Sequence, residues 1–133
     1  MANGNPAGAL AVIDFEASCL PEHGQSYPIE VAVARIDGEN RAWLIRPLRA
    51  WEHWDWSQEA EALHGISRAM LDCDGLPASQ VLAEMIEFVG DCAVYSDAEL
   101  DEYWLEVLCQ GLAAALPFPI RYLGEWMVEH GFT

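Results

Sequence analysis

Residues Ala9-Leu10-Ala11-Val12-Ile13-Asp14-Phe15-Glu16-Ala17-Ser18-Cys19 form an apolar run that ends in acidic side chains. The run is typical of a buried strand, and because side chains alternate along a strand, Asp14 and Glu16 share one face. Residues two apart on a strand lie about 6.5 Å apart, so two ionised carboxylates on a partly apolar face repel unless a proton or a cation bridges them. The run therefore predicts either a divalent-metal site or a strand end at which both acids are hydrated.

Length and charge limit the possible classes of protein. The chain has 133 residues, of which 53% are hydrophobic, and this is enough for one globular domain spanning residues 1–133. The formal net charge of −16 repels nucleic acid at long range, which excludes non-specific duplex binding. Four of the six arginines lie in one window, residues 35–49, so either a local basic patch or four scattered arginines is expected.

The sequence indicates a protein of the cytoplasm. No apolar stretch approaches the roughly 20 residues of a membrane span, and the first residues lack the positive charge of a secretory signal. The four cysteines are widely spaced without a C-x-x-C pair, which argues against a zinc cage. We therefore expect four free thiols and no contact with a membrane.

The order of the expected elements is that of an α/β fold. Three antiparallel strands come first, with a turn at 37–40 between the second and the third, and an α-β-α segment follows. The expected strands are 9–16, 28–36, 41–46 and 92–95. The expected helices are 57–63, a short one capped by Ser67, 77–89, 99–112 and 122–130.

A second acidic signal lies on the helix expected over 99–112. Asp101 extends the apolar stripe of Trp104, Leu105 and Leu108 backward at helical spacing, so its carboxylate points with the core. A buried, unpaired carboxylate costs several kcal/mol, so Asp101 needs an arginine or a metal as partner unless it sits at the edge of the apolar face. Asp97, one turn earlier, is a candidate N-cap.

Three stretches in order resemble the DEDD superfamily of 3′-to-5′ exonucleases, which includes proofreading exonuclease subunits and RNase T. Asp14-Phe15-Glu16 is similar to its first motif, D-x-E, and its extension to Cys19 looks most like the exoribonuclease branch. Residues 61–67 resemble the segment with a G-I-[ST] turn. Residues 94–105 align without gaps on the second motif, V-x-H-N-x-x-F-D-x-x-F-L, which places Asp101 on the metal-binding Asp.

The resemblance implies an RNase H-like mixed sheet and two-metal hydrolysis of phosphodiester bonds with Mg²⁺ or Mn²⁺. It implies that Asp14 bridges both metals, that Glu16 holds the metal carrying the nucleophilic water, and that Asp101 supports the other. The implied substrate is a single-stranded RNA or DNA 3′ end. Its terminal nucleotide would contact Phe15, Ala17, His64 and Ile66, although His64 is equally well explained as an ordinary turn histidine.

The chain departs from this family after Asp101. Active members carry a fourth Asp on a C-terminal helix, five residues after a His or four after a Tyr, and no such pair follows here. The resemblance covers roughly residues 9–115, so we expect the last helix to be missing and an apolar sheet face to be exposed. Such a face normally binds something, which predicts a homodimer or a partner that covers it.

The Trp-rich segment 51–56 follows the third strand in an expected loop. Its aromatic side chains either stack on unpaired bases or, as we favour, pack under the loop. The function expected from the sequence is a 3′-to-5′ exonuclease. The alternatives are a catalytically inactive relative that acts as a binding module, and an acidic interaction protein whose motif matches are accidental.

Overall fold

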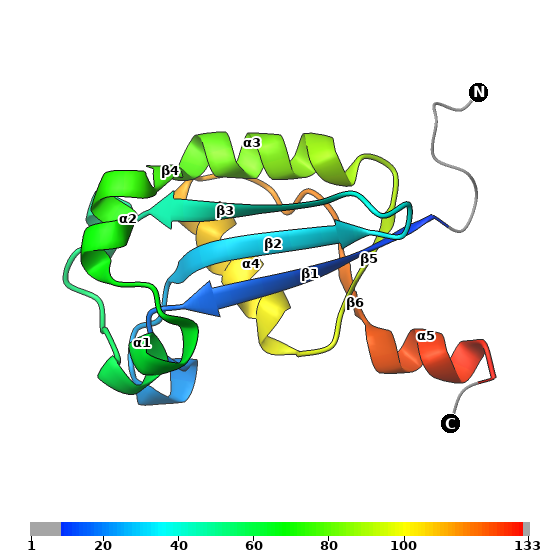
Figure 1. Ribbon diagram of the computed structural model, residues 1–133, viewed down its shortest axis with the longest axis horizontal. Coiled ribbons are helices and arrows are strands. Elements are labelled where there is room, and N and C mark those ends of the chain that lie inside the picture. Colours follow the sequence, from blue (N-terminus) through cyan, green and yellow to red (C-terminus); the bar gives the residue numbers. More distant parts are fainter. Residues whose placement is uncertain (1–8, 132–133) are drawn as a thin grey trace.

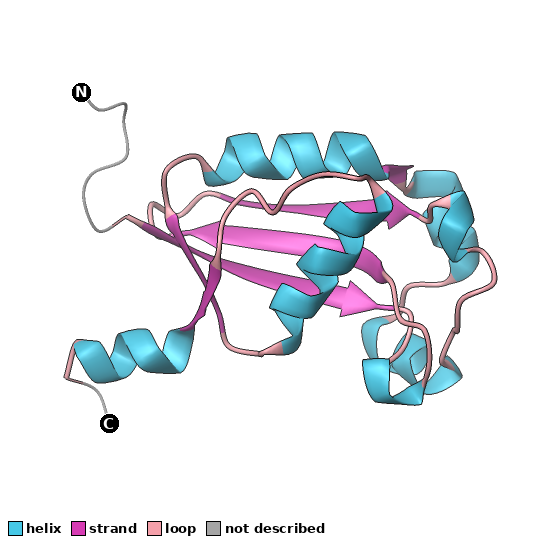
Figure 2. Ribbon diagram, turned by 180° about the vertical axis from the view of Figure 1, so that it is seen from behind, coloured by secondary structure: helices cyan, strands magenta, loops and turns pink. Residues whose placement is uncertain are grey.

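A computed structural model describes residues 9–131 as a six-stranded sheet with long helices packed against one of its faces (Figures 1 and 2). The strands are β1 (Leu10–Ala17), β2 (Pro28–Arg35), β3 (Asn40–Arg46), β4 (Leu76–Pro77), β5 (Ala93–Ser96) and β6 (Ile120–Tyr122). The helices are α1 (Gln58–His64), α2 (Arg68–Asp74), α3 (Ala78–Val89), α4 (Leu100–Gly111) and α5 (Leu123–Glu129), with 3-10 turns η1 (Pro21–His23) and η2 (Arg49–Trp51).

The strand β1 lies inside the sheet, whose order is β4-β3-β2-β1-β5-β6. It pairs antiparallel with β2, which pairs antiparallel with β3, and it pairs parallel with β5 on its other side. The predicted order of three antiparallel strands followed by helix, strand and helix is therefore confirmed. The sequence did not predict β4 and β6, which have only two and three residues.

The two faces of β1 differ in burial as the alternation predicts. Ala11, Ile13 and Phe15 are at most 3% exposed and join the core under α3 and α4, which lie over this face in Figure 2. Asp14 and Glu16 point to the opposite face. Figure 1 looks onto that opposite face, and no helix of the described residues crosses β1, β2 or β3 there.

The open face is only partly apolar. Asp14 pairs in register with Ala32, and Glu16 with Glu30, so acidic and small side chains share its centre. The apolar exposed face that the sequence predicts is therefore not what this side of the sheet shows, because carboxylates occupy its centre. The homodimer or covering partner stays a prediction.

Two predicted helix caps are confirmed and one is wrong. The side chains of Ser57 and Ser67 accept hydrogen bonds from the N–H groups of Ala60 and Met70, each at 3.1 Å, and begin α1 and α2. Asp97 does not cap α4, because that helix starts at Leu100 after Glu99, which makes no side-chain cap. The N-cap position is Glu99, and Asp97 lies two residues before it in the preceding turn.

The Trp-rich loop packs against the body of the protein, as favoured from the sequence. Trp51 is buried and stacks on Tyr27 with ring centroids 5.5 Å apart, while Trp54 and Trp56 pack against the core. Arg35 and Arg41 form ion pairs with Asp37 and Glu84, so these two arginines of the 35–49 window are neutralised locally.

All four cysteines are free thiols, as predicted. Within residues 9–131, no helix has the length and apolar character that crossing a membrane requires.

Candidate metal centre

Three acidic side chains from separate parts of the chain meet at the end of the central strand. Asp14 comes from β1, Asp97 from the turn that follows β5, and Asp101 from the first turn of α4. One carboxylate oxygen of each lies within 4.8 Å of the others. We call Asp14, Asp97 and Asp101 the acidic cluster. The structure thus brings together two of the three metal ligands expected from the sequence, and adds Asp97.

Asp101 is the buried member of the cluster, at 1% exposure. Its Oδ1 accepts a hydrogen bond from the Phe15 N–H at 2.8 Å, and its Oδ2 accepts one from the Ser96 hydroxyl. The pairing of β1 with β5 ends at Val12, so the carboxylate takes the place of a strand partner for Phe15. The inward direction predicted for Asp101 is confirmed. Its partners are these two donors, and no arginine of the described residues pairs with it.

Glu16 lies on the same strand face as Asp14 but outside the 4.8 Å group. Burial raises the pKa of its carboxyl, and the negative charges of Asp14, Glu30 and Asp101 raise it further. The pKa of Glu16 therefore depends on the charge of the cluster, although Glu16 is not one of its members.

The cluster concentrates negative charge that no cation of the described residues balances. Burial raises the pKa of Asp14, and the charge of Asp97 adds to this rise. Burial also raises the pKa of Asp101, although its hydrogen bonds with Ser96 and Phe15 oppose the shift. The donors are carboxylate oxygens only, which suits Mg²⁺ or Mn²⁺ and not the softer metals that select thiolate or imidazole. The residues present therefore fit a divalent hard cation.

We expect the metal-free protein to be more stable near pH 5 than near pH 7.5. The folded-state pKa values of Asp14, Glu16 and Asp101 are raised above their ordinary values of 3.8, 4.5 and 3.8. The stability linked to these groups is present below the ordinary values and is lost as pH rises through the raised ones. Thermal unfolding midpoints measured in EDTA at both pH values test this.

Two controls separate the cluster from the general negative charge of the chain. In Asp14→Asn, and in wild type saturated with Mn²⁺, the difference between the two midpoints should become smaller. A wild-type midpoint that does not rise on acidification contradicts the prediction, as does an Asp14→Asn variant with the wild-type difference.

A cavity of about 260 Å³ opens beside Glu16. Its walls include Phe15, Ala17, His64 and Trp104, so three of the four residues that the resemblance assigned to nucleotide contact line one space with the acid. Ile66 is different, because its side chain is 5% exposed and belongs to the core.

Ile66 acts on this cavity through its backbone. Its N–H donates to Nδ1 of His64 at 3.0 Å, which places the ring proton on Nε2. Burial lowers the pKa of His64, so the ring is neutral at pH 7. Nε2 faces the Ala17 carbonyl, which opposes the shift, but forms no hydrogen bond of normal geometry with any described residue. His64 thus lines the cavity as a neutral ring whose Nε2 is itself buried.

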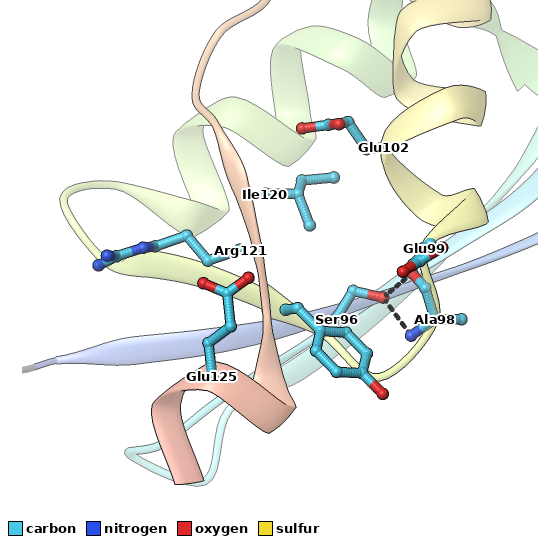
Figure 3. Close-up of a pocket in the computed structure, with 8 residues that line it drawn as sticks. Ser96, Ala98, Glu99, Glu102, Ile120, Arg121 and Glu125 are labelled. Carbon is cyan, nitrogen blue, oxygen red and sulfur yellow. Dashed lines mark hydrogen bonds between the residues drawn. The ribbon is translucent and has the colours of Figure 1, made fainter. Parts of the chain in front are cut away.

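A second cavity, of about 470 Å³, is lined by Ser96 and Ala98, the neighbours of Asp97 in the chain (Figure 3). Glu99 and Glu102 reach it from the start of α4, and Arg121 and Glu125 from β6 and α5. Three carboxylates against one guanidinium make this cavity unfavourable for a phosphate chain.

No protein-family model and no curated protein matches this sequence. Solved structures do match the fold. One, titled for 3′-end specific recognition of a histone mRNA stem-loop by a 3′-exonuclease, has a TM-score of 0.64 at 21% identity, over 80% of this chain and 42% of that one. An exonuclease I from Methylocaldum szegediense has a TM-score of 0.65 at 18% identity, over 86% of this chain and 27% of that one. A product-bound exonuclease I has a TM-score of 0.67 at 14% identity, over 90% of this chain and 31% of that one.

The chain has the fold of the 3′-exonucleases. At these identities the likeness shows the fold alone, and the fold class predicted from the sequence, an RNase H-like mixed sheet, is confirmed. The chain spans less than half the length of these three structures.

Proposed function

We propose that this chain is a metal-dependent 3′-to-5′ exonuclease that removes nucleotides from single-stranded RNA or DNA. The observation that carries the proposal is the meeting of Asp14 and the buried Asp101 at the end of the central strand of a 3′-exonuclease fold. A pair of carboxylates in a strand motif occurs widely by chance. Their convergence with an acid from a distant helix, in this fold, is much more specific.

Asp14, Glu16 and Asp101 are the proposed metal ligands. These residues would hold divalent ions, whose chemistry in hydrolysis would be to activate water and to neutralise the charge that develops on a phosphate. The Phe15 N–H and the Ser96 hydroxyl fix the Asp101 carboxylate in one orientation before any ion binds. Such preorganisation of a ligand by surrounding hydrogen bonds is what a site for a rigidly coordinated ion requires.

The cavity beside Glu16 is the proposed site of the 3′-terminal nucleotide. Trp104, Phe15 and Ala17 give it apolar walls for a base or sugar, and it adjoins the acidic cluster through Glu16. His64 adds a neutral ring to these walls, with its Nδ1 already engaged by the Ile66 N–H. Because this cavity lies at the end of β1, we expect it to receive the terminal nucleotide of a single nucleic-acid strand rather than a continuous duplex.

Charge makes the proposed activity depend strictly on metal. The chain carries a net charge of −16, so a phosphate group that approaches the acidic cluster is repelled in the absence of cations. EDTA should therefore abolish both substrate binding at the site and hydrolysis. This distinguishes the proposed site from nucleic-acid surfaces that use lysine and arginine.

The test uses 5′-labelled single strands of RNA and of DNA, each with a free or a blocked 3′ end, incubated with the purified chain and Mn²⁺. We expect stepwise shortening of strands with a free 3′ end and none with the blocked end or with EDTA. Comparison of the RNA and DNA substrates identifies the class of nucleic acid. Binding of Mn²⁺ without any shortening would overturn the enzymatic proposal and favour the non-catalytic binding module.

A further inference from the structure

Asp97 has no structural task that explains its position. It does not cap α4, and among the described residues its carboxylate accepts no hydrogen bond and forms no ion pair. It nevertheless holds an oxygen within 4.8 Å of oxygens of Asp14 and Asp101. At such a separation two unit charges repel by several kcal/mol when the effective dielectric constant is about 20. The arrangement costs stability unless a cation completes it.

The turn that carries Asp97 is held in place from both sides. The Ser96 hydroxyl accepts a hydrogen bond from the Ala98 N–H at 2.9 Å, as Figure 3 shows, and donates to the Asp101 carboxylate. Asp97 lies between these two residues, so the same hydroxyl that orients Asp101 also fixes the backbone on which Asp97 stands. Its exposed carboxylate faces the cluster from the solvent side, opposite the buried Asp101.

We propose that Asp97 is a further carboxylate ligand of the divalent-metal site. The inference rests on the proposed function and extends its ligand set from three acids to four. With Asp14, Glu16 and Asp101, it brings the formal charge of the ligands to −4, which balances two divalent cations. Ligand charge count is a principal determinant of affinity for hard cations. In the second-motif pattern that the chain resembles, this position is a neutral Asn, so the added charge is particular to this chain.

Within residues 9–131, Asp97 supplies the cluster with a carboxylate that the C-terminal elements β6 and α5 do not supply. Among residues 9–131, no acid from β6 or α5 joins the cluster, and Glu125 of α5 lines the second cavity instead. Asp97 reaches the cluster from the turn before α4 instead. The fourth carboxylate thus comes from the same local segment as Asp101, four residues away, and not from a C-terminal helix.

The experiment is a calorimetric titration of Mn²⁺ alone into the full chain. It compares wild type with Asp97→Asn and Glu99→Gln. Glu99 is an exposed acid two residues further on that lies outside the cluster, so Glu99→Gln matches the change in net charge. We expect Asp97→Asn to weaken Mn²⁺ binding by about 10-fold or more, the scale on which single residues around a metal act. Glu99→Gln should bind as wild type does.

Thermal unfolding supplies a second reading that a merely structural role does not give. In EDTA, Asp97→Asn should unfold at a higher temperature than wild type, because the substitution removes repulsion within the cluster. The rise in the unfolding midpoint from EDTA to saturating Mn²⁺ should be smaller for Asp97→Asn than for wild type. A residue that only stabilises the turn would lower the midpoint in EDTA.

The outcomes separate this inference from the proposed function. If wild type binds no Mn²⁺, the metal site itself is wrong and both proposals fail. If wild type and Asp97→Asn give the same isotherm, Asp97 is not a ligand and the three-acid site stands. If Glu99→Gln weakens binding as much as Asp97→Asn, general charge explains the effect and the inference is overturned.

Discussion

Replacement of Asp14 by Asn is expected to slow Mn²⁺-dependent shortening of a single strand by at least about 100-fold. Asp14 is the one acid that stands both on β1 with Glu16 and within 4.8 Å of Asp97 and Asp101, so it is central to every ligand arrangement the site permits. Asn keeps the size of the side chain and one oxygen but removes the charge. The measurement is the initial rate of loss of 3′ nucleotides at saturating Mn²⁺.

The matched control is Glu30→Gln. Glu30 lies on β2 opposite Glu16 in register, and burial and then the charge of Asp14 raise the pKa of its carboxyl, so it shares the charged face without belonging to the cluster. We expect Glu30→Gln to retain activity within a few-fold of wild type. Equal losses in the two variants would show that the charge of the face, and not a ligand, is being measured. Circular dichroism of Asp14→Asn should be that of wild type, because the side chain makes no hydrogen bond that an amide would break.

The parts of the site that local patterns control were predictable from the sequence. The alternation in β1 placed Asp14 and Glu16 on one face and Phe15 on the other, and burial in the structure follows that alternation. The helical stripe of Trp104 and Leu105 placed Asp101 toward the interior, where it is 1% exposed. In both elements a repeat of two or of about 3.6 residues fixes the direction of a side chain whatever the rest of the chain does.

Contacts between segments far apart in the sequence could not be predicted from such local patterns. Phe15 donates to Asp101 across 86 residues, and nothing in either local sequence indicates that the strand lacks its partner there. Asp97 shows the same limit. An acid shortly before a helix has the same local signature whether it caps the helix or faces another carboxylate, and Asp97 would be the cap only if α4 began at residue 98 instead of Leu100.

Short elements and backbone roles were also missed for physical reasons. The strand β6 has three residues, too few for an alternation to be seen, and it forms only because β5 offers a free edge. Ile66 was expected to contact substrate through its side chain. Its apolar side chain instead joins the core, and only its N–H reaches the site by holding His64, a role that any residue other than proline can fill.

Asp101 is expected to show two separable functions when it is changed in two ways. Asp101→Ala leaves the Phe15 N–H without its acceptor in a buried place, whereas the Ser96 hydroxyl can still donate to the Ala98 carbonyl at 2.7 Å. An unsatisfied buried donor costs about 1–3 kcal/mol. Asp101→Asn retains an oxygen for the Phe15 N–H, and the Ser96 hydroxyl can turn to accept from the new amide. We therefore expect Asp101→Ala to lower the free energy of unfolding by about 1–3 kcal/mol, and Asp101→Asn to lower it by much less.

Both variants should nevertheless lose Mn²⁺ affinity, because both remove the charge that faces Asp14 and Asp97. Urea unfolding in EDTA measures the first effect, and calorimetric titration of Mn²⁺ measures the second. Asp101→Asn is the decisive variant, since a folded protein of near wild-type stability that no longer binds Mn²⁺ assigns the charge of Asp101 to the metal. Isotherms identical to wild type in Asp101→Asn would restrict Asp101 to joining β1 to α4, and the convergence of acids at the end of the central strand would lose its meaning as a metal centre.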